Sequence, residues 1–130
     1  ASMFTQEHFR QLGFLEGRWV GTGPDGKPFY EQYAFTGPAE LKSMRFKDEH
    51  FDEQTDSSTV ALQGDTITST WGDFTWRASS IQHDKACFDP LEAPSAFCWE
   101  RVSADLVEVT QRWTDDKGQP QTYVVQLRRL

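Results

Sequence analysis

Polar and apolar residues alternate along most of the chain, in short segments that turn residues separate. Glycine, proline and aspartate are frequent at such breaks, and two of the breaks, 64–65 and 115–118, are typical of tight hairpins. Alternation with period two predicts β-strands that have one buried face. We expect strands over 18–22, 29–35, 41–47, 58–63, 66–71, 74–82, 85–88, 96–102, 106–113 and 121–129.

The N-terminal segment has a different period. Phe9, Leu12 and Leu15 recur every three residues, which favours one face of a helix, and Thr5 is a suitable N-cap. A helix of about ten residues that ends near Gly17 is too short to be stable alone. We therefore expect it to pack over one end of the sheet structure.

One helix followed by about ten strands predicts an all-β fold. No helical segment separates the strands, so a parallel βαβ arrangement is excluded. The short spacing between strands is typical of an antiparallel sandwich or barrel. We expect a single antiparallel up-and-down β-barrel of 8–10 strands with a short N-terminal helix, forming one domain over 3–130.

Composition narrows the possible functions. Five Trp and ten Phe among 130 residues argue against disorder, and a net charge of −7 makes nucleic-acid binding improbable. No apolar run approaches the roughly 20 residues of a transmembrane helix. The start, Ala1-Ser2-Met3-Phe4, has no secretory signal pattern, and Ala1-Ser2 reads as a cloning remnant before a native Met3. We expect a cytoplasmic protein without membrane contact, as a monomer or a homodimer.

The stretch 17–23, Gly-Arg-Trp-Val-Gly-Thr-Gly, places Trp19 between glycines at period two. Glycine weakens a strand unless the backbone bends sharply or approaches another group closely. One interpretation is that Trp19 lies flat across the end of a barrel. The other is an ordinary strand with one core tryptophan and a glycine-rich turn after it.

This stretch resembles the Gly-x-Trp opening strand of the calycins, the superfamily of lipocalins and fatty-acid-binding proteins, and the Gly-x-Trp-x-Gly-x-Gly start of nitrobindins. Residues 86–90, 99–101 and 126–130 are similar to bacterial calycin-like proteins of unknown function. The resemblance extends over most of the chain by strand order. It implies a barrel fold but says little about function.

Two expectations follow from the resemblance. In calycins the opening tryptophan packs against a basic residue near the end of the barrel, and for Trp19 that residue is either Arg128 or Arg129. Nitrobindins bind haem through a histidine near the C-terminus, whereas the histidines here are residues 8, 50 and 83. Haem ligation of that kind is unsupported, and we expect no cofactor.

Glu31 has the same alternation phase as Phe29, Tyr33 and Phe35, so an inward aromatic face would carry an acid into the barrel. A buried carboxylate needs a partner, which Arg45 on the next strand could supply. Together they would form the polar anchor of a ligand site, with Tyr33 beside them. If the phase is reversed, Glu31 is solvated. Arg45 is the weaker inference, because the opposite face of its strand carries Met44 and Phe46.

The remaining tryptophans, Trp71, Trp76, Trp99 and Trp113, lie in four different predicted strands. An apolar, aromatic cavity with a few polar groups is typical of small-ligand sites. Alternatively, the tryptophans fill the interior completely, since a small barrel is only just wide enough for its own side chains.

Cys87 and Cys98 flank the 89–95 loop symmetrically, which would place them opposite each other in a hairpin. A disulfide is geometrically possible, but in a cytosolic chain two reduced core thiols are the better expectation. The acidic stretch 48–53 could bind a cation weakly or simply be solvated.

The sequence shows no nucleophile motif and no phosphate-binding loop. We therefore expect non-enzymatic binding of a small, partly apolar ligand inside the barrel. Two alternatives remain open. One is a calycin-type isomerase or cyclase that uses Glu31 or Tyr33 as a general acid or base. The other is a structural barrel with a filled core that presents its surface to a partner.

Overall fold

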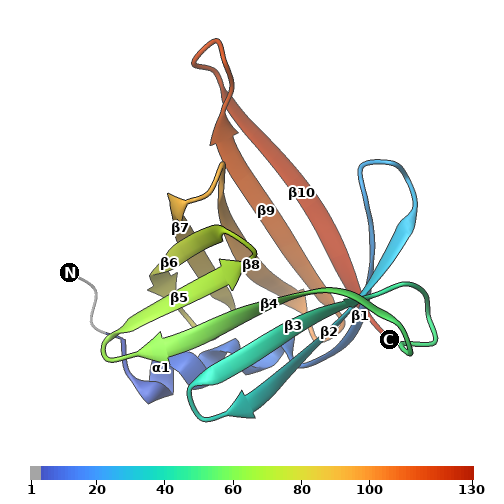
Figure 1. Cartoon of the computed structure of the whole chain (residues 1–130), viewed down its shortest axis with the longest axis horizontal. Helices are drawn as coiled ribbons and strands as arrows, with labels where there is room; N and C mark the ends of the chain where they lie inside the picture. The colour runs from blue at the N-terminus through green and yellow to red at the C-terminus, as the bar shows by residue number, and fades with distance from the viewer. Residues whose placement is uncertain (1–3) are drawn as a thin grey trace.

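In the computed structural model, which describes residues 4–130, the chain forms a closed antiparallel barrel of ten strands (Figure 1). The strands follow one another around the barrel in chain order, and the first and last strands pair to close it. The expected all-β up-and-down barrel with a short N-terminal helix is confirmed. The proposed remnant Ala1-Ser2 lies outside the described residues.

The ten strands match the alternating segments closely. Most boundaries agree to within one or two residues, and two differ by four: β4 begins earlier and β7 ends later than predicted. The strands are β1 (Gly17–Thr22), β2 (Pro28–Gly37), β3 (Glu40–Phe46), β4 (Gln54–Gln63), β5 (Thr66–Trp71), β6 (Phe74–Ile81), β7 (Lys85–Glu92), β8 (Ala96–Ser103), β9 (Leu106–Thr114) and β10 (Pro120–Arg129).

Both of these differences arise where a strand includes residues that the sequence pattern assigns to a loop. β4 begins at Gln54, so Asp56 lies in a strand and not in a loop; it is the register partner of Arg45 on β3. β7 continues through Pro90, which pairs with Trp76 of β6 where the register shifts. Proline is tolerated at such irregularities because the ladder is already interrupted there.

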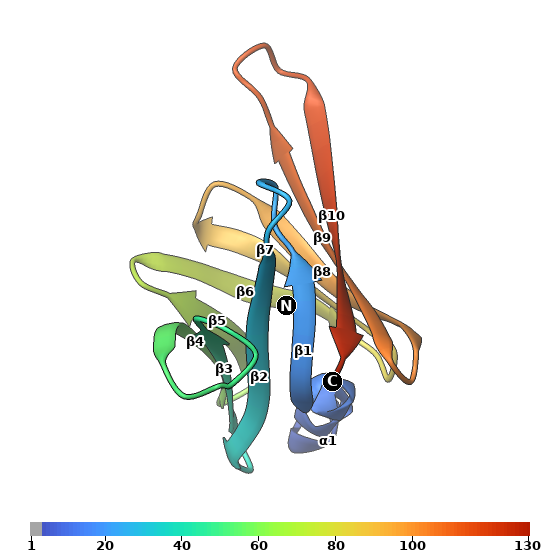
Figure 2. The same cartoon turned by 90° about the vertical axis from the view of Figure 1, so that its right-hand side faces the viewer.

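The N-terminal segment closes one end of the barrel (Figures 1 and 2). It consists of α1 (Gln6–Arg10), a single α-helical turn, which continues as a 3₁₀-helix over Gln11–Leu15. Thr5 is the N-cap, as predicted: its side chain accepts from the backbone N–H of His8. The inward residues are fully buried, namely Phe9, Leu12 and Leu15. Neither helical segment among the described residues is long and apolar enough to cross a membrane.

Trp19 lies at this closed end and is completely buried. Its indole N–H donates to the carbonyl oxygen of Leu15 at 2.8 Å, which ties the barrel to the helical segment. The guanidinium carbon of Arg129 lies 4.2 Å from the centre of the Trp19 ring. Arg129 also donates to the carbonyl oxygens of Phe14 and Glu16, at 3.2 and 2.6 Å. Tryptophan, arginine and the end of the helical segment therefore form one plug.

The basic partner of Trp19 is thus Arg129 and not Arg128. Arg128 is exposed and pairs with Val20. Val20 directly follows Trp19 in β1, so this pair lies on the opposite face of the sheet from Trp19. Only two residue pairs join β1 to β10. Beyond them, β10 continues with β9 into a hairpin that projects past the other strands (Figures 1 and 2).

Two glycines of the 17–23 stretch are required for different reasons. Gly17 has φ of +125°, a conformation that other residues adopt only with strain. Gly21 has no such strain, but a Cβ atom there would lie 2.5 Å from the Phe29 ring and 2.9 Å from Leu127. The glycine at position 21 therefore lets β1 approach both side chains closely.

Gly21→Ala should lower the free energy of unfolding by about 1–3 kcal/mol, as overpacking does, because Leu127 is buried and must shift. Gly37→Ala is the matched control: Gly37 also lies in a strand, and a Cβ atom there would meet nothing within 4 Å. Urea denaturation of both variants measures the difference. Equal losses in the two variants would contradict the close approach at Gly21.

Candidate functional site

The barrel interior contains a cavity of about 470 Å³, within the range of small-molecule sites. Tyr33 is the register partner of Gly17, so it lies toward the helical end of the barrel. Phe29 is the partner of Gly21, four residues farther along β1, so it lies nearer the opposite end. Both line the cavity, which therefore extends from the core toward the end opposite the helix. The complete lining is Phe29, Glu31, Tyr33, Ser43, Arg45, Asp56, Ser57, Ser58, Ser69, Trp71, Phe74, Trp76, Pro94, Ser95, Phe97, Trp99, Val109, Gln111, Val125 and Leu127.

Glu31, Tyr33 and Arg45 meet on this cavity wall. Glu31 and Arg45 are register partners on β2 and β3, and Arg45 Nη2 lies 2.8 Å from Glu31 Oε2. The Tyr33 hydroxyl donates to the other carboxylate oxygen, Oε1, at 3.0 Å. Both oxygens of Glu31 therefore have partners. The Arg45 guanidinium also covers the Phe29 ring, with its carbon 4.4 Å from the ring centre.

The three side chains differ in their exposure to solvent. Tyr33 is buried, the Glu31 side chain is 12% exposed and the Arg45 side chain is 47% exposed, so the group extends from the core to the mouth. Burial raises the pKa of Tyr33 well above its ordinary value, and the negative charge of Glu31 raises it further. Tyr33 is therefore a neutral phenol at physiological pH, able to donate a hydrogen bond.

Arg45 lies on the cavity wall because alternation in β3 places Leu41 and Ser43, both buried, on the same face. Met44 and Phe46 occupy the outer face, although both are large and apolar. Phe46 packs there against Phe51 of the following loop, with ring centres 5.1 Å apart. The outer face of β3 is therefore apolar because Phe46 contacts a neighbouring loop. This contact explains why the large residues Met44 and Phe46 do not point inward in place of Arg45.

Aromatic rings form the opposite wall and run from the mouth to the core. Trp71 is 43% exposed and lies 5.6 Å from Phe74, whereas Trp99, at the other end of the series, is 5% exposed. Trp76 donates its indole N–H to the carbonyl oxygen of Ser95 at 2.7 Å, which fixes that ring. Neighbouring ring centres in the series Trp71, Phe74, Trp76, Phe97 and Trp99 are 5.0–6.2 Å apart.

Trp113 does not line this cavity, and its expected place in the wall is wrong. Its alternation phase is that of Val109 and Gln111, which do line the cavity. The last pair between β8 and β9 is Ala96 with Arg112. Trp113 therefore lies beyond the end of β8 and is 37% exposed. Alternation predicts the face of a residue, but not whether another strand extends far enough to cover it.

Sequence reasoning missed the hydroxyl-rich part of the wall. Ser43, Ser57, Ser58 and Ser69 line the cavity from β3, β4 and β5. Ser43 has the same alternation phase as Leu41 and Arg45, and this phase could have identified it as a lining residue. Asp56 was missed because the sequence reads as an acidic loop over residues 48–56, which includes it. The Asp56 carboxylate accepts the indole N–H of Trp71 and the backbone N–H of Ser57 at the cavity mouth.

The histidines take no part in the site. His8 belongs to the helix cap, where its Nδ1 lies 3.0 Å from the Thr5 backbone nitrogen, and His50 and His83 are exposed. Over residues 4–130, no three His, Cys, Asp or Glu side chains are grouped closely enough to hold a metal ion.

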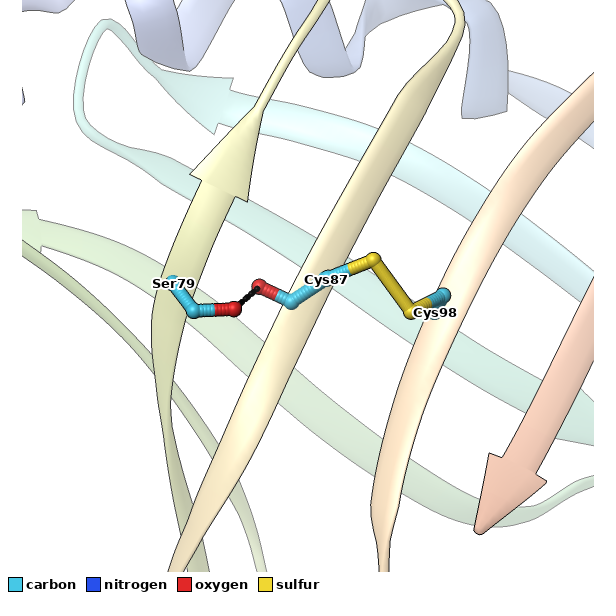
Figure 3. Close-up of a disulfide and its surroundings, with 3 residues drawn as sticks. All are labelled: Ser79, Cys87 and Cys98. Carbon is cyan, nitrogen blue, oxygen red and sulfur yellow. Dashed lines mark hydrogen bonds between the residues drawn. A yellow bond between two sulfur atoms is a disulfide. The ribbon is translucent and has the colours of Figure 1, made fainter.

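The cysteine pair corrects a sequence-based expectation. Cys87 and Cys98 face each other across β7 and β8, as predicted, but they form a disulfide and are not reduced thiols (Figure 3). Their Cα atoms are 4.1 Å apart, because directly opposed residues of an antiparallel pair approach closely. Cys98 is 7% exposed, but Phe97 and Trp99 face the interior, so Cys98 between them lies on the outer face of the barrel.

No protein-family model matches the chain, and no curated protein matches it in sequence. Two solved structures are similar along nearly the whole chain. One is a redesigned β-barrel, b11L5F_LGL, with a TM-score of 0.41 and 13% identity; the similarity covers 100% of this chain and 99% of that one. The other is EF1p2_mFAP2b bound to DFHBI, with a TM-score of 0.45 and 13% identity, covering 93% and 98%.

Proposed function

We propose that the chain binds a small, partly apolar molecule inside the barrel and does not convert it chemically. The observation that carries this proposal is the 470 Å³ cavity with an aromatic wall on one side and Glu31, Tyr33 and Arg45 on the other. Such a combination provides apolar area for affinity and a few polar groups for orientation.

Binding is favoured over catalysis by the way the polar groups are occupied. Tyr33 donates its proton to Glu31, and Glu31 is also paired with Arg45. A general base should be free to accept a proton from the substrate, whereas this carboxylate already has a partner at each oxygen. The isomerase or cyclase alternative would require that cluster to open first.

The calycin-like identity is likewise a proposal. The contact between Trp19 and Arg129 supports it, because the resemblance leads us to expect a basic residue against the opening tryptophan. For the cellular location, the disulfide is the stronger argument: structural disulfides persist in oxidising compartments and are rare in the cytosol. We therefore favour an oxidising compartment over the cytoplasm that the sequence led us to expect.

The test is binding of a neutral bicyclic alcohol, 2-naphthalenemethanol, followed by quenching of tryptophan fluorescence. Glu31→Gln and Arg45→Met should each change the affinity by about threefold or more, the effect of one altered hydrogen bond. Arg18→Met and Glu108→Gln are matched controls. Arg18 also covers an aromatic ring, that of Phe51, and Glu108 also accepts a hydrogen bond, from Gln126.

The two controls should bind the probe as the unmodified protein does, since neither residue lines the cavity. Binding that no cavity substitution alters would place the site elsewhere. Absence of binding, for this probe and for other neutral aromatics of similar size, would favour the structural alternative.

A further inference from the structure

The cavity lining has an uneven charge balance. Among its residues, Glu31 and Asp56 carry negative charges at neutral pH and Arg45 carries the positive one, which leaves one net negative charge. A ligand that enters the cavity loses part of its water shell, so the sign of this charge affects which ligands bind.

The positive charge of Arg45 is already engaged. Two of its nitrogens donate to Glu31 Oε2, at 2.8 and 3.3 Å, and its guanidinium lies over the Phe29 ring. For an anionic ligand, the charge of this cation is therefore already largely balanced by Glu31. Displacing Glu31 would leave its largely buried carboxylate without a counter-ion, which is costly.

Asp56, in contrast, has no cationic partner in the part of the chain that the structure describes. Arg45 is its register neighbour on β3, yet the guanidinium turns toward Glu31 on the other side. The carboxylate of Asp56 accepts only neutral donors, the indole N–H of Trp71 and the backbone N–H of Ser57. It is the uncompensated charge at the mouth.

Aromatic rings stand beside this carboxylate. Trp71 contacts it through the N–H edge of its indole, and Phe74 and Trp76 continue the wall inward. The faces of such rings attract cations, tryptophan most strongly. The mouth is also partly open, since Trp71 and Phe74 are 43% and 38% exposed, so a bound ammonium group there could keep some of its water.

We propose that the preferred ligand is a small aromatic amine in its protonated form, with the ammonium group at Asp56 and the ring along the aromatic wall. This inference rests on the proposed function and specifies its ligand class. The same charges disfavour carboxylates, so fatty acids and aromatic acids should bind more weakly than amines of equal size.

Three naphthalene probes of nearly equal size test the proposal: 2-naphthylmethylamine, 2-naphthalenemethanol and 2-naphthoate, titrated by calorimetry at neutral pH. The amine should bind more tightly than the alcohol, and the alcohol more tightly than the acid. We expect about a tenfold difference between amine and acid, which corresponds to about 1.4 kcal/mol.

Asp56→Asn separates the local charge from the field of the whole protein. Asparagine still accepts the Trp71 hydrogen bond but carries no charge, so the amine should lose most of its advantage over the alcohol while the alcohol is bound as before. Asp116→Asn is the control, because it removes an equal charge from the exposed β9–β10 turn. That variant should keep the preference of the unmodified protein.

The possible failures are distinguishable. If the alcohol binds and 2-naphthoate binds as tightly as the amine, the ligand class is wrong but the proposed function stands. An amine preference that survives Asp56→Asn would assign it to the overall charge of −7 and overturn the role of Asp56. If none of the three probes binds, both proposals fail together.

Discussion

Replacing Trp19 with alanine should lower the free energy of unfolding by about 3–5 kcal/mol, the usual cost of truncating a large buried aromatic side chain. Trp19 is completely buried, and its loss would also leave the carbonyl oxygen of Leu15 without its donor. Arg129 would lose the ring that it covers. The helical segment, the opening strand and the closing strand would therefore all lose a contact at once.

Chemical denaturation measures this loss, and Trp113→Ala is the matched control. Trp113 is the same residue type in another strand of the barrel, but it is 37% exposed beyond the end of β8. Its truncation should cost clearly less than that of Trp19, because more than a third of its surface is already exposed and it donates no buried hydrogen bond to the helical segment. Similar losses for both tryptophans would mean that Trp19 is not the plug of the barrel.

Reduction of the Cys87–Cys98 disulfide should lower the free energy of unfolding by roughly 2–3 kcal/mol. The bond closes a short loop, with a sequence separation of 11, and the entropy removed from the unfolded chain rises with loop length. The remaining hairpin pairs keep the two strands together in the folded state, so the barrel should unfold more easily without changing its fold. Urea denaturation with and without reductant measures the effect.

The double variant Cys87→Ala/Cys98→Ala provides the control, since its stability should not respond to reductant. Titration of the unfolded, unreduced protein should find no free thiol at the mass of one chain. A count of two thiols would show that the cysteines are reduced, and it would restore the cytosolic expectation.

Much of the barrel could be predicted from local sequence because strand alternation is a local property. Phe29, Glu31 and Tyr33 lie on one face whatever the rest of the chain does, so the common phase of the acid and the rings could be read directly. The N-cap Thr5 and the turn at residues 64–65 are equally local, since hydrogen bonds within a few residues decide them.

Contacts between strands decided the rest. The choice of Arg129 over Arg128 depends on which residue of β10 shares the face of Trp19, and only the pairing of the first and last strands establishes that. The exposure of Trp113 depends on where β8 ends. Asp56 became a cavity residue because β4 pairs with β3 farther than its acidic sequence suggests.

The candidate site combines both kinds of information. Alternation alone placed Glu31 and Tyr33 on one face, and a reversed phase would have turned that face to solvent. The barrel decided that this face points inward, that Arg45 spans from Glu31 to the Phe29 ring, and that Asp56 stays without a counter-ion. Periodicity assigns each side chain to one of two faces, whereas register and strand length, which come from hydrogen bonds between distant segments, determine its neighbours.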